Sequence, residues 1–167
     1  MRRQFLHLMT DNNNPIIDTP IDPMEAAFEQ ARRAETRGEV PIGAVLVDAN
    51  TGKILAAHGN RVEELCDPTA HAEMLVIREA ALKKQSPRLI DCDLYVTLEP
   101  CAMCAQAISF ARVRRLYFAA YDPKGGGVDH GPRIYTHSTC HHAPEVIGGL
   151  REQEAAGMLQ TFFKIKR

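Results

Sequence analysis

Two short segments of the chain carry side chains that can hold a metal ion. Residues 71–73 read His-Ala-Glu, and residues 100–104 read Pro-Cys-Ala-Met-Cys. A Cys-x-x-Cys spacing brings two sulfur atoms close enough for one ion, and imidazole is the other common zinc ligand. Three protein ligands leave the fourth position of a tetrahedral zinc ion open to water, as in catalytic sites. We therefore predict that His71, Cys101 and Cys104 bind one zinc ion per chain.

Glu73 supplies the group that such a site needs to move protons. A carboxylate two positions after a ligand can accept a proton from the metal-activated water and return it to a leaving group. Residues i and i+2 do not share a face of a helix. His71 and Glu73 can therefore serve one site only if metal and substrate lie beyond the end of a helix, not along its side.

The surrounding sequence predicts elements that place both segments at helix starts. Composition and apolar residues at helical spacing predict four helices, over residues 23–37, 69–84, 100–110 and 150–163. Asp22 is the expected N-cap of the first helix, with Glu25 completing a capping box. Short β-branched runs predict strands over residues 42–47, 53–57, 94–98 and 115–120, before a long loop over 125–144. This order favours a mixed or parallel sheet covered on both faces, and helix N-termini favour the thiolates that bind metal.

Length and composition are those of one globular domain. The chain has 167 residues, of which 45% are hydrophobic and 25% charged, so it is not a disordered protein. We assign residues 1–21 to a disordered N-terminal tail and residues 22–167 to the folded domain. The odd count of five cysteines argues against a disulfide framework. Neither a secretory signal nor an apolar stretch of membrane-spanning length is evident, so we expect a cytoplasmic protein without a membrane partner.

Charge is nearly balanced overall but uneven along the chain. The net charge of −1 excludes binding of nucleic acid or membrane by bulk charge alone. Residues 1–104 carry a net charge of −5, whereas residues 105–167 carry +4. Such asymmetry indicates a polyanionic partner. The alternative is that folding mixes the two halves and erases it.

The two segments together are far more specific than either one alone. A lone Cys-x-x-Cys could be a thioredoxin-like redox pair, but that reading leaves the His-x-Glu segment unexplained. The combination H-x-E…P-C-x-x-C is typical of zinc nucleobase deaminases.

Longer segments resemble one family within that class. Residues 67–73 (Asp-Pro-Thr-Ala-His-Ala-Glu) and 95–104 (Tyr-Val-Thr-Leu-Glu-Pro-Cys-Ala-Met-Cys) are similar to the bacterial tRNA-specific adenosine deaminases, as are residues 39–45 and 59–61. The resemblance extends from about residue 24 to residue 164. It implies a three-layer α/β/α sandwich of the cytidine deaminase type with a mixed five-stranded sheet, and a homodimer.

The same resemblance implies an activity. Members of the family deaminate adenosine to inosine at the wobble position of a tRNA anticodon. His71, Cys101 and Cys104 would be the zinc ligands, and Glu73 would be the proton shuttle for a zinc-activated water. Asn60 would hydrogen-bond the flipped base, although a turn residue after Gly59 is the simpler interpretation.

Contacts to the RNA are also implied by position. Asp122 and Lys124 match the loop that lines the family's anticodon pocket, and Phe163 could pack on a nucleotide unless it belongs to the core. Candidate phosphate contacts, each of which could instead be a solvated surface charge, are Arg112, Arg114, Arg115, Lys164, Lys166 and Arg167.

The sequence departs from the family pattern after the fourth predicted strand. Pro123 and the run of glycines at 125–127 suggest a differently shaped substrate loop. A second group of possible ligands follows, which would hold a second metal or simply shape the RNA pocket: His137, Cys140, His141 and His142.

Two other functions fit the same residues. A free nucleobase or nucleoside deaminase, acting on guanine or cytosine, would need the same zinc site. A non-catalytic structural partner would have no need of Glu73, which is present.

Overall fold

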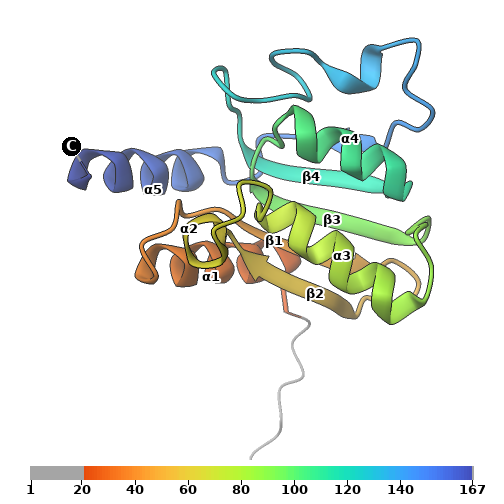
Figure 1. The fold of residues 1–167 in the computed structure, drawn as a ribbon, viewed down its shortest axis with the longest axis horizontal. Helices are drawn as coiled ribbons and strands as arrows, with labels where there is room; N and C mark the ends of the chain where they lie inside the picture. The colour runs from red at the N-terminus through yellow and green to blue at the C-terminus, as the bar shows by residue number, and fades with distance from the viewer. Residues whose placement is uncertain (1–20, 167) are drawn as a thin grey trace, which may run out of the picture.

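The fold is built on one mixed five-stranded sheet (Figure 1). The computed structural model describes residues 21–166, so the predicted tail of residues 1–21 lies, apart from its last residue, outside the described part. The strands, in the spatial order β2-β1-β3-β4-β5, are β1 (Gly43–Asp48), β2 (Ile54–Gly59), β3 (Cys92–Leu98), β4 (Arg115–Ala120) and β5 (Glu145–Ile147). β1 runs antiparallel to both of its neighbours, whereas β3, β4 and β5 are parallel.

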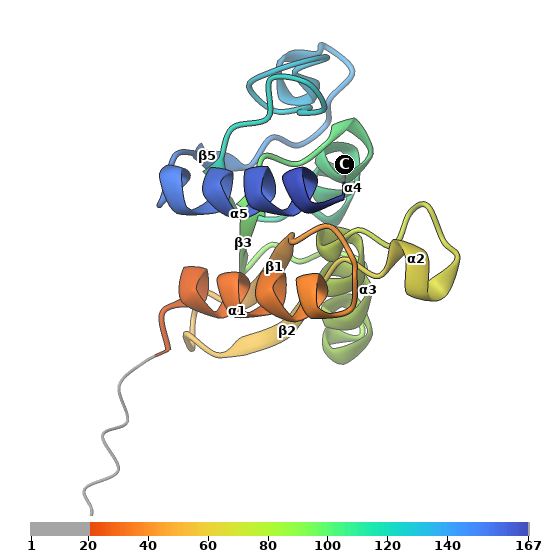
Figure 2. The same cartoon turned by 90° about the vertical axis from the view of Figure 1, so that its left-hand side faces the viewer.

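Helices cover both faces of this sheet, which confirms the expected three-layer sandwich (Figure 2). The helices are α1 (Pro23–Thr36), α2 (Val62–Leu65), α3 (Ala72–Lys84), α4 (Ala102–Ala111) and α5 (Glu152–Ile165), with a 3₁₀ turn over Ile134–Thr136. α3 and α4 pack on one face, and α1 and α5 pack on the other. None of the helices in residues 21–166 is long and apolar enough to cross a lipid bilayer.

Burial on both faces explains the unbroken apolar run of β1. Ala44 and Leu46 point into the core beneath α3 and α4, whereas Val45 and Val47 point into the core beneath α1 and α5. A strand with two buried faces needs no polar alternation. Only the length of this run and its β-branched residues therefore predict a strand from the sequence.

Two short elements were missed by pattern reading. α2 has four residues and β5 has three, too few for a helical or alternating pattern to be recognised. The five strands implied by the resemblance are nevertheless present. α3 begins at Ala72 rather than at residue 69, so that His71 lies just before the helix.

α1 lies unusually close to the strand pair β1–β2 because glycines face it. A Cβ atom on Gly43 would lie 2.0 Å from the carbonyl oxygen of Ala27, and one on Gly59 would lie 2.5 Å from that of Gln30. Asp22 caps α1 as predicted, accepting from the Met24 N–H at 3.0 Å. Glu25 does not complete a capping box, because its carboxylate binds arginines instead.

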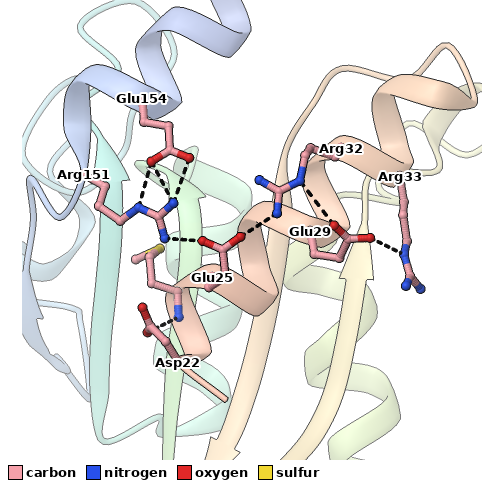
Figure 3. A network of polar contacts seen from close by, with 8 residues as sticks. Asp22, Glu25, Glu29, Arg32, Arg33, Arg151 and Glu154 are labelled. Carbon is pink, nitrogen blue, oxygen red and sulfur yellow. Dashed lines mark hydrogen bonds and ion pairs between the residues drawn. The ribbon is translucent and has the colours of Figure 1, made fainter. Parts of the chain in front are cut away.

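Those arginines join α1 to α5 in a chain of ion pairs (Figure 3). Arg151, just before α5, contacts Glu25 at 2.7 Å and Glu154 at 2.7 Å. Arg32 contacts the other oxygen of Glu25 at 2.6 Å. The Arg151 guanidinium also lies 4.2 Å from the centre of the Phe28 ring. The network fixes where α5 starts over α1, while its exposed ion pairs add little to stability.

α3 and α4 share an uncommon ending. Gln85 ends α3 with φ 49° and Arg112 ends α4 with φ 55°, both in the left-handed region. Glycine is usual at such ends because side chains are strained there.

Gly43→Ala tests the close packing of α1. The added methyl group meets main-chain atoms that cannot turn aside, so we expect a loss of about 2 kcal/mol or more in the free energy of unfolding. The matched control is Gly157→Ala, where nothing lies within 4 Å of the added carbon. The control should gain up to about 1 kcal/mol from helix propensity. Urea unfolding of both variants measures the difference, and equal midpoints would contradict the packing argument.

Candidate metal centre

Three predicted ligands converge in the structure. Nδ1 of His71 lies 3.7 Å from Sγ of Cys101 and 3.6 Å from Sγ of Cys104. Zinc–nitrogen and zinc–sulfur bonds of about 2.0 and 2.3 Å, at a tetrahedral angle, place the two ligand atoms about 3.5 Å apart. One imidazole and two thiols at these spacings therefore fit a zinc ion. Within residues 21–166 this is the only cluster of three or more potential ligands.

Both ligand segments lie at helix N-termini, as predicted. His71 is the N-cap of α3 and Cys101 is the N-cap of α4, and neither side chain caps its own helix. Cys104 lies in the first turn of α4 and is fully buried. Since the site faces the open ends of both helices, their unpaired N–H groups favour the negative thiolates.

The protonation of the two thiols is linked. The Cys104 thiol donates a hydrogen bond to Cys101, and this contact, with help from His71, lowers the pKa of Cys101 to about 4. The same hydrogen bond and burial raise the pKa of Cys104. The pair therefore holds one thiolate readily, and a bound cation would release the second proton.

Glu73 lies in the first turn of α3, and its side chain is buried against the ligands. The residue is 4% exposed. Burial raises the pKa of its carboxyl to about 7, against the opposing effect of His71. A group with such a pKa can both accept and release a proton near neutral pH. His71 and Glu73, two positions apart, can serve one site because that site lies beyond the end of the helix and not along its side.

Asn60 has a defined structural role beside the ligands. It follows β2, is 4% exposed, and its Oδ1 accepts the Ala72 N–H at 2.9 Å. This contact identifies which atom of the amide is the oxygen and leaves its NH₂ group as the donor. Asn60 is thus more than a turn residue, and it lies next to His71 and Glu73.

The loop after β4 runs directly past the ligands. Gly126 pairs with Cys101 in an isolated β-bridge, and Gly127 donates to the Pro100 carbonyl at 2.8 Å. A Cβ atom on Gly127 would lie 2.5 Å from the Ala102 nitrogen. The glycine run that departs from the family pattern is therefore required by close main-chain approach.

Asp122 and Lys124 lie at the start of this loop. Oδ1 of Asp122 accepts the N–H groups of Lys124 and Gly125 at 3.1 and 3.0 Å. Both residues border a cavity of about 520 Å³ between the loop and α5. Phe163, 49% exposed, and Lys164 line its other side, whereas Phe162 is buried in the core.

The other expected phosphate contacts lie elsewhere. Arg112 ends α4, and Arg114 and Arg115 stand at the beginning of β4, at the end of the strands opposite the ligands. Arg114 forms a bidentate pair with Asp93, and Arg115 pairs with Glu145. These arginines therefore lie away from the ligands, and their role toward RNA stays a prediction. Lys166 donates to the Gly38 carbonyl, and Arg167 lies outside the described residues.

The second group of histidines and cysteine does not converge. His142 contacts the Val113 carbonyl at 2.7 Å, His137 contacts the Pro132 carbonyl, and Cys140 donates to the His142 carbonyl at 3.1 Å. The imidazoles of His137 and His142 and the thiol of Cys140 are thus used on main-chain oxygens. Of the two interpretations, the structure favours a shaped loop over a second metal.

Glu99 is a buried residue of the site that pattern reading did not single out. It follows β3 directly and precedes Pro100, and its side chain has no exposed surface. The sequence did offer one signal for it, namely an acidic residue placed between a predicted buried strand and the Cys-x-x-Cys pair.

Comparison with known proteins agrees with this geometry. The sequence model of the cytidine and deoxycytidylate deaminase zinc-binding region matches residues 19–120. A tRNA-specific adenosine deaminase of Agrobacterium fabrum is 58% identical over 144 residues, which are 86% of this chain and 93% of the relative.

Solved structures point the same way. One from a study of A-to-I editing by tRNA:A34 deaminases at the wobble position superposes with a TM-score of 0.79 at 58% identity, covering 82% of this chain and 98% of the other. A guanine deaminase of Bacillus subtilis superposes with a TM-score of 0.57 at 39% identity, covering 59% of this chain and 62% of the other. The A34 deaminase structure is the more similar of these two in sequence, at 58% identity against 39%.

Cys104→Ser tests whether the fold or the metal assembles this centre. Because the sheet and helices hold the ligands, we expect the variant to lose zinc while its circular dichroism spectrum stays that of the parent protein. Plasma mass spectrometry should find about one zinc ion per parent chain. The control is Cys66→Ser, an exposed cysteine outside the site. Two zinc ions per chain, or unfolding on chelation, would contradict this account.

Proposed function

Since the chain belongs to the tRNA-specific adenosine deaminases of the cytidine and deoxycytidylate deaminase family, we propose that it deaminates adenosine to inosine at the wobble position of a tRNA anticodon. The observation that carries the proposal is the buried carboxylate of Glu73 beside a three-ligand centre, at an edge of the sheet bordered by the Asp122–Lys124 loop. That edge brings together three side chains that can bind a metal, a proton carrier, and a cavity that would face the RNA.

His71, Cys101 and Cys104 would hold the zinc ion, whose contribution when bound is to lower the pKa of the attacking water. Glu73 takes a proton from that water as its oxygen attacks C6 of adenine, and delivers this proton to the ring nitrogen N1. It then moves the second proton of the attacking water from the oxygen to the amine, so that the bond from C6 to the amine breaks, ammonia leaves and the C6 carbonyl of inosine forms. A carboxyl whose pKa burial raises to about 7 suits both transfers.

Asn60 would orient the base. Its oxygen is engaged by the Ala72 N–H, so its NH₂ group is the part that can donate to an acceptor on the purine. Because the same side chain caps the start of α3, the base would be held at a fixed place relative to His71 and Glu73.

The cavity between the loop and α5 would receive the anticodon loop. Bases there are already unpaired, so moving one into a site costs less than in a duplex. Phe163 offers a ring on which a base can stack, and Lys124 and Lys164 offer charges for phosphates. Asp122 would bind RNA with its second oxygen, since the first caps the turn.

We extend the proposal to the assembly and its setting. The catalytic domain would comprise residues 22–167, with residues 1–21 as an appended tail, and would work in the cytoplasm as a homodimer. Exposed apolar side chains support a contact between copies at the ends of α3 and α4. These are Leu82, Ile90 and Phe110, at 80%, 57% and 70% exposure.

Glu73→Gln tests the function and the proton carrier together. The amide keeps the shape of the side chain but cannot take up the proton, so inosine formation in an anticodon stem-loop should fall by about 10²–10⁴-fold. Zinc content and RNA affinity should stay at parent values. Glu79→Gln is the matched control, because Glu79 lies on the same helix and pairs with Lys83 instead.

The rival function is tested with the same samples. Deamination of free guanine or cytosine by the parent protein, with the adenosine stem-loop left unchanged, would overturn the tRNA proposal. Full activity of Glu73→Gln would overturn only the assignment of the proton carrier.

Removing Lys124 and Lys164 tests the RNA-binding cavity. Each phosphate contact to a single strand contributes about 0.7 to the slope of log affinity against log salt concentration, so the double alanine variant should bind more weakly and lose about 1.4 of that slope. Lys53→Ala, at the opposite edge of the sheet, is the control. An unchanged slope would place the RNA elsewhere.

A further inference from the structure

Glu99 gathers an unusual number of donors around one buried carboxylate. Oε1 accepts the N–H groups of Val128, Asp129 and His130 at 3.2, 2.8 and 2.9 Å. Oε2 accepts the N–H of Asp122 at 2.9 Å and lies 2.8 Å from Nδ1 of His130. One side chain thus binds both ends of the loop over residues 122–130.

The carboxylate is surrounded by donors in this setting. Four main-chain N–H groups and Nδ1 of His130 face its two oxygens. Hydrogen bonds to a charged group are stronger than those between neutral groups. The loop is therefore tied to the end of β3 by charge-assisted bonds, in addition to the packing of Val128 in the core.

The loop is also shaped to fit this anion. A Cβ atom on Gly126 would lie 2.5 Å from Oε1 of Glu99 and 2.6 Å from the Asp122 carbonyl oxygen. Gly126 pairs with Cys101 at the same point. The Glu99 contacts therefore determine both the conformation of the loop and how closely it approaches the ligand segment.

We propose that Glu99 is a positioning residue that sets the substrate loop, with Asp122 and Lys124, at a fixed place relative to the metal centre. The expected effect of Glu99 on catalysis rests on the proposed function, whereas its effect on the position of the loop does not. Without the anion, the loop would adopt the binding arrangement for only part of the time. Apparent affinity falls in proportion to that fraction, while a substrate once bound meets an unchanged centre.

Glu99→Gln is the direct test. The amide presents N–H groups toward donors, so at least one of the loop contacts is lost. Hydrogen exchange at the amides of residues 122 and 128–130 should speed up by about tenfold or more, with exchange in β3 and β4 unchanged. KM for the anticodon stem-loop should rise as the fraction of loop in the binding arrangement falls, about twofold if that fraction is halved, with kcat and zinc content near parent values.

Gly126→Ala provides a second route if Glu99→Gln fails to fold. Its methyl group would push the loop off the carboxylate while leaving Glu99 itself in place, so the same exchange and KM changes are expected. Gly157→Ala and Glu79→Gln are the matched controls for the two changes, and neither should alter loop exchange.

The outcomes separate the two proposals. Unchanged exchange and KM in a folded Glu99→Gln, or in Gly126→Ala, would overturn the positioning role. Loss of zinc together with kcat would also overturn it, because Glu99 would then support the metal and not the loop. If the parent protein forms no inosine, the proposed function is overturned. Faster hydrogen exchange of the loop in the variants would still support the positioning role of Glu99.

Discussion

The parallel pairing of β3 with β4 is the constraint on which the site depends. Leu98 pairs with Ala120 at the ends of the two strands, and the Glu99 N–H continues the ladder to the Ala120 carbonyl at 2.8 Å. Because parallel strands end at the same edge, the chain leaving β3 toward Cys101 and the chain leaving β4 toward Asp122 must start side by side. α4 makes the crossover between them, so its N-terminus falls at that edge. β1 and β2 then bring Asn60 to the start of α3.

Local sequence was enough to predict the metal centre. Ligand type, the Cys-x-x-Cys spacing and the helix starts all act over a few residues, and the structure confirms that His71, Cys101 and Cys104 meet at zinc spacing. The four longer strands were also predicted, because runs of β-branched residues are visible without knowing their partners. The five-stranded sandwich itself was implied by the resemblance, since β5 is too short to recognise.

What could not be predicted depends on pairings between distant residues. The C-terminal net charge indicated a basic surface, but the sheet places Arg114 and Arg115 at the far edge and neutralises them with Asp93 and Glu145. Asn60 looked like a turn residue because its partner, the Ala72 N–H, lies 12 positions away. The position of Glu99 marked it as unusual, but its role could not be predicted, since all of its donors lie 23 to 31 positions further along the chain. The roles of Asn60, Asp122, Lys124 and Phe163 toward RNA stay predictions.

The left-handed ends of α3 and α4 bear on how this protein can evolve. Each helix has its ligand-bearing start at the site and its strained residue, Gln85 or Arg112, at the opposite end. A non-glycine residue in that conformation costs about 1 kcal/mol, which glycine would largely recover. Part of the backbone strain that a glycine substitution would relieve therefore lies a full helix length away from the metal-ligating residues. Stability gained there could offset destabilising changes in the substrate loop, so that new RNA preferences could arise without loss of the fold.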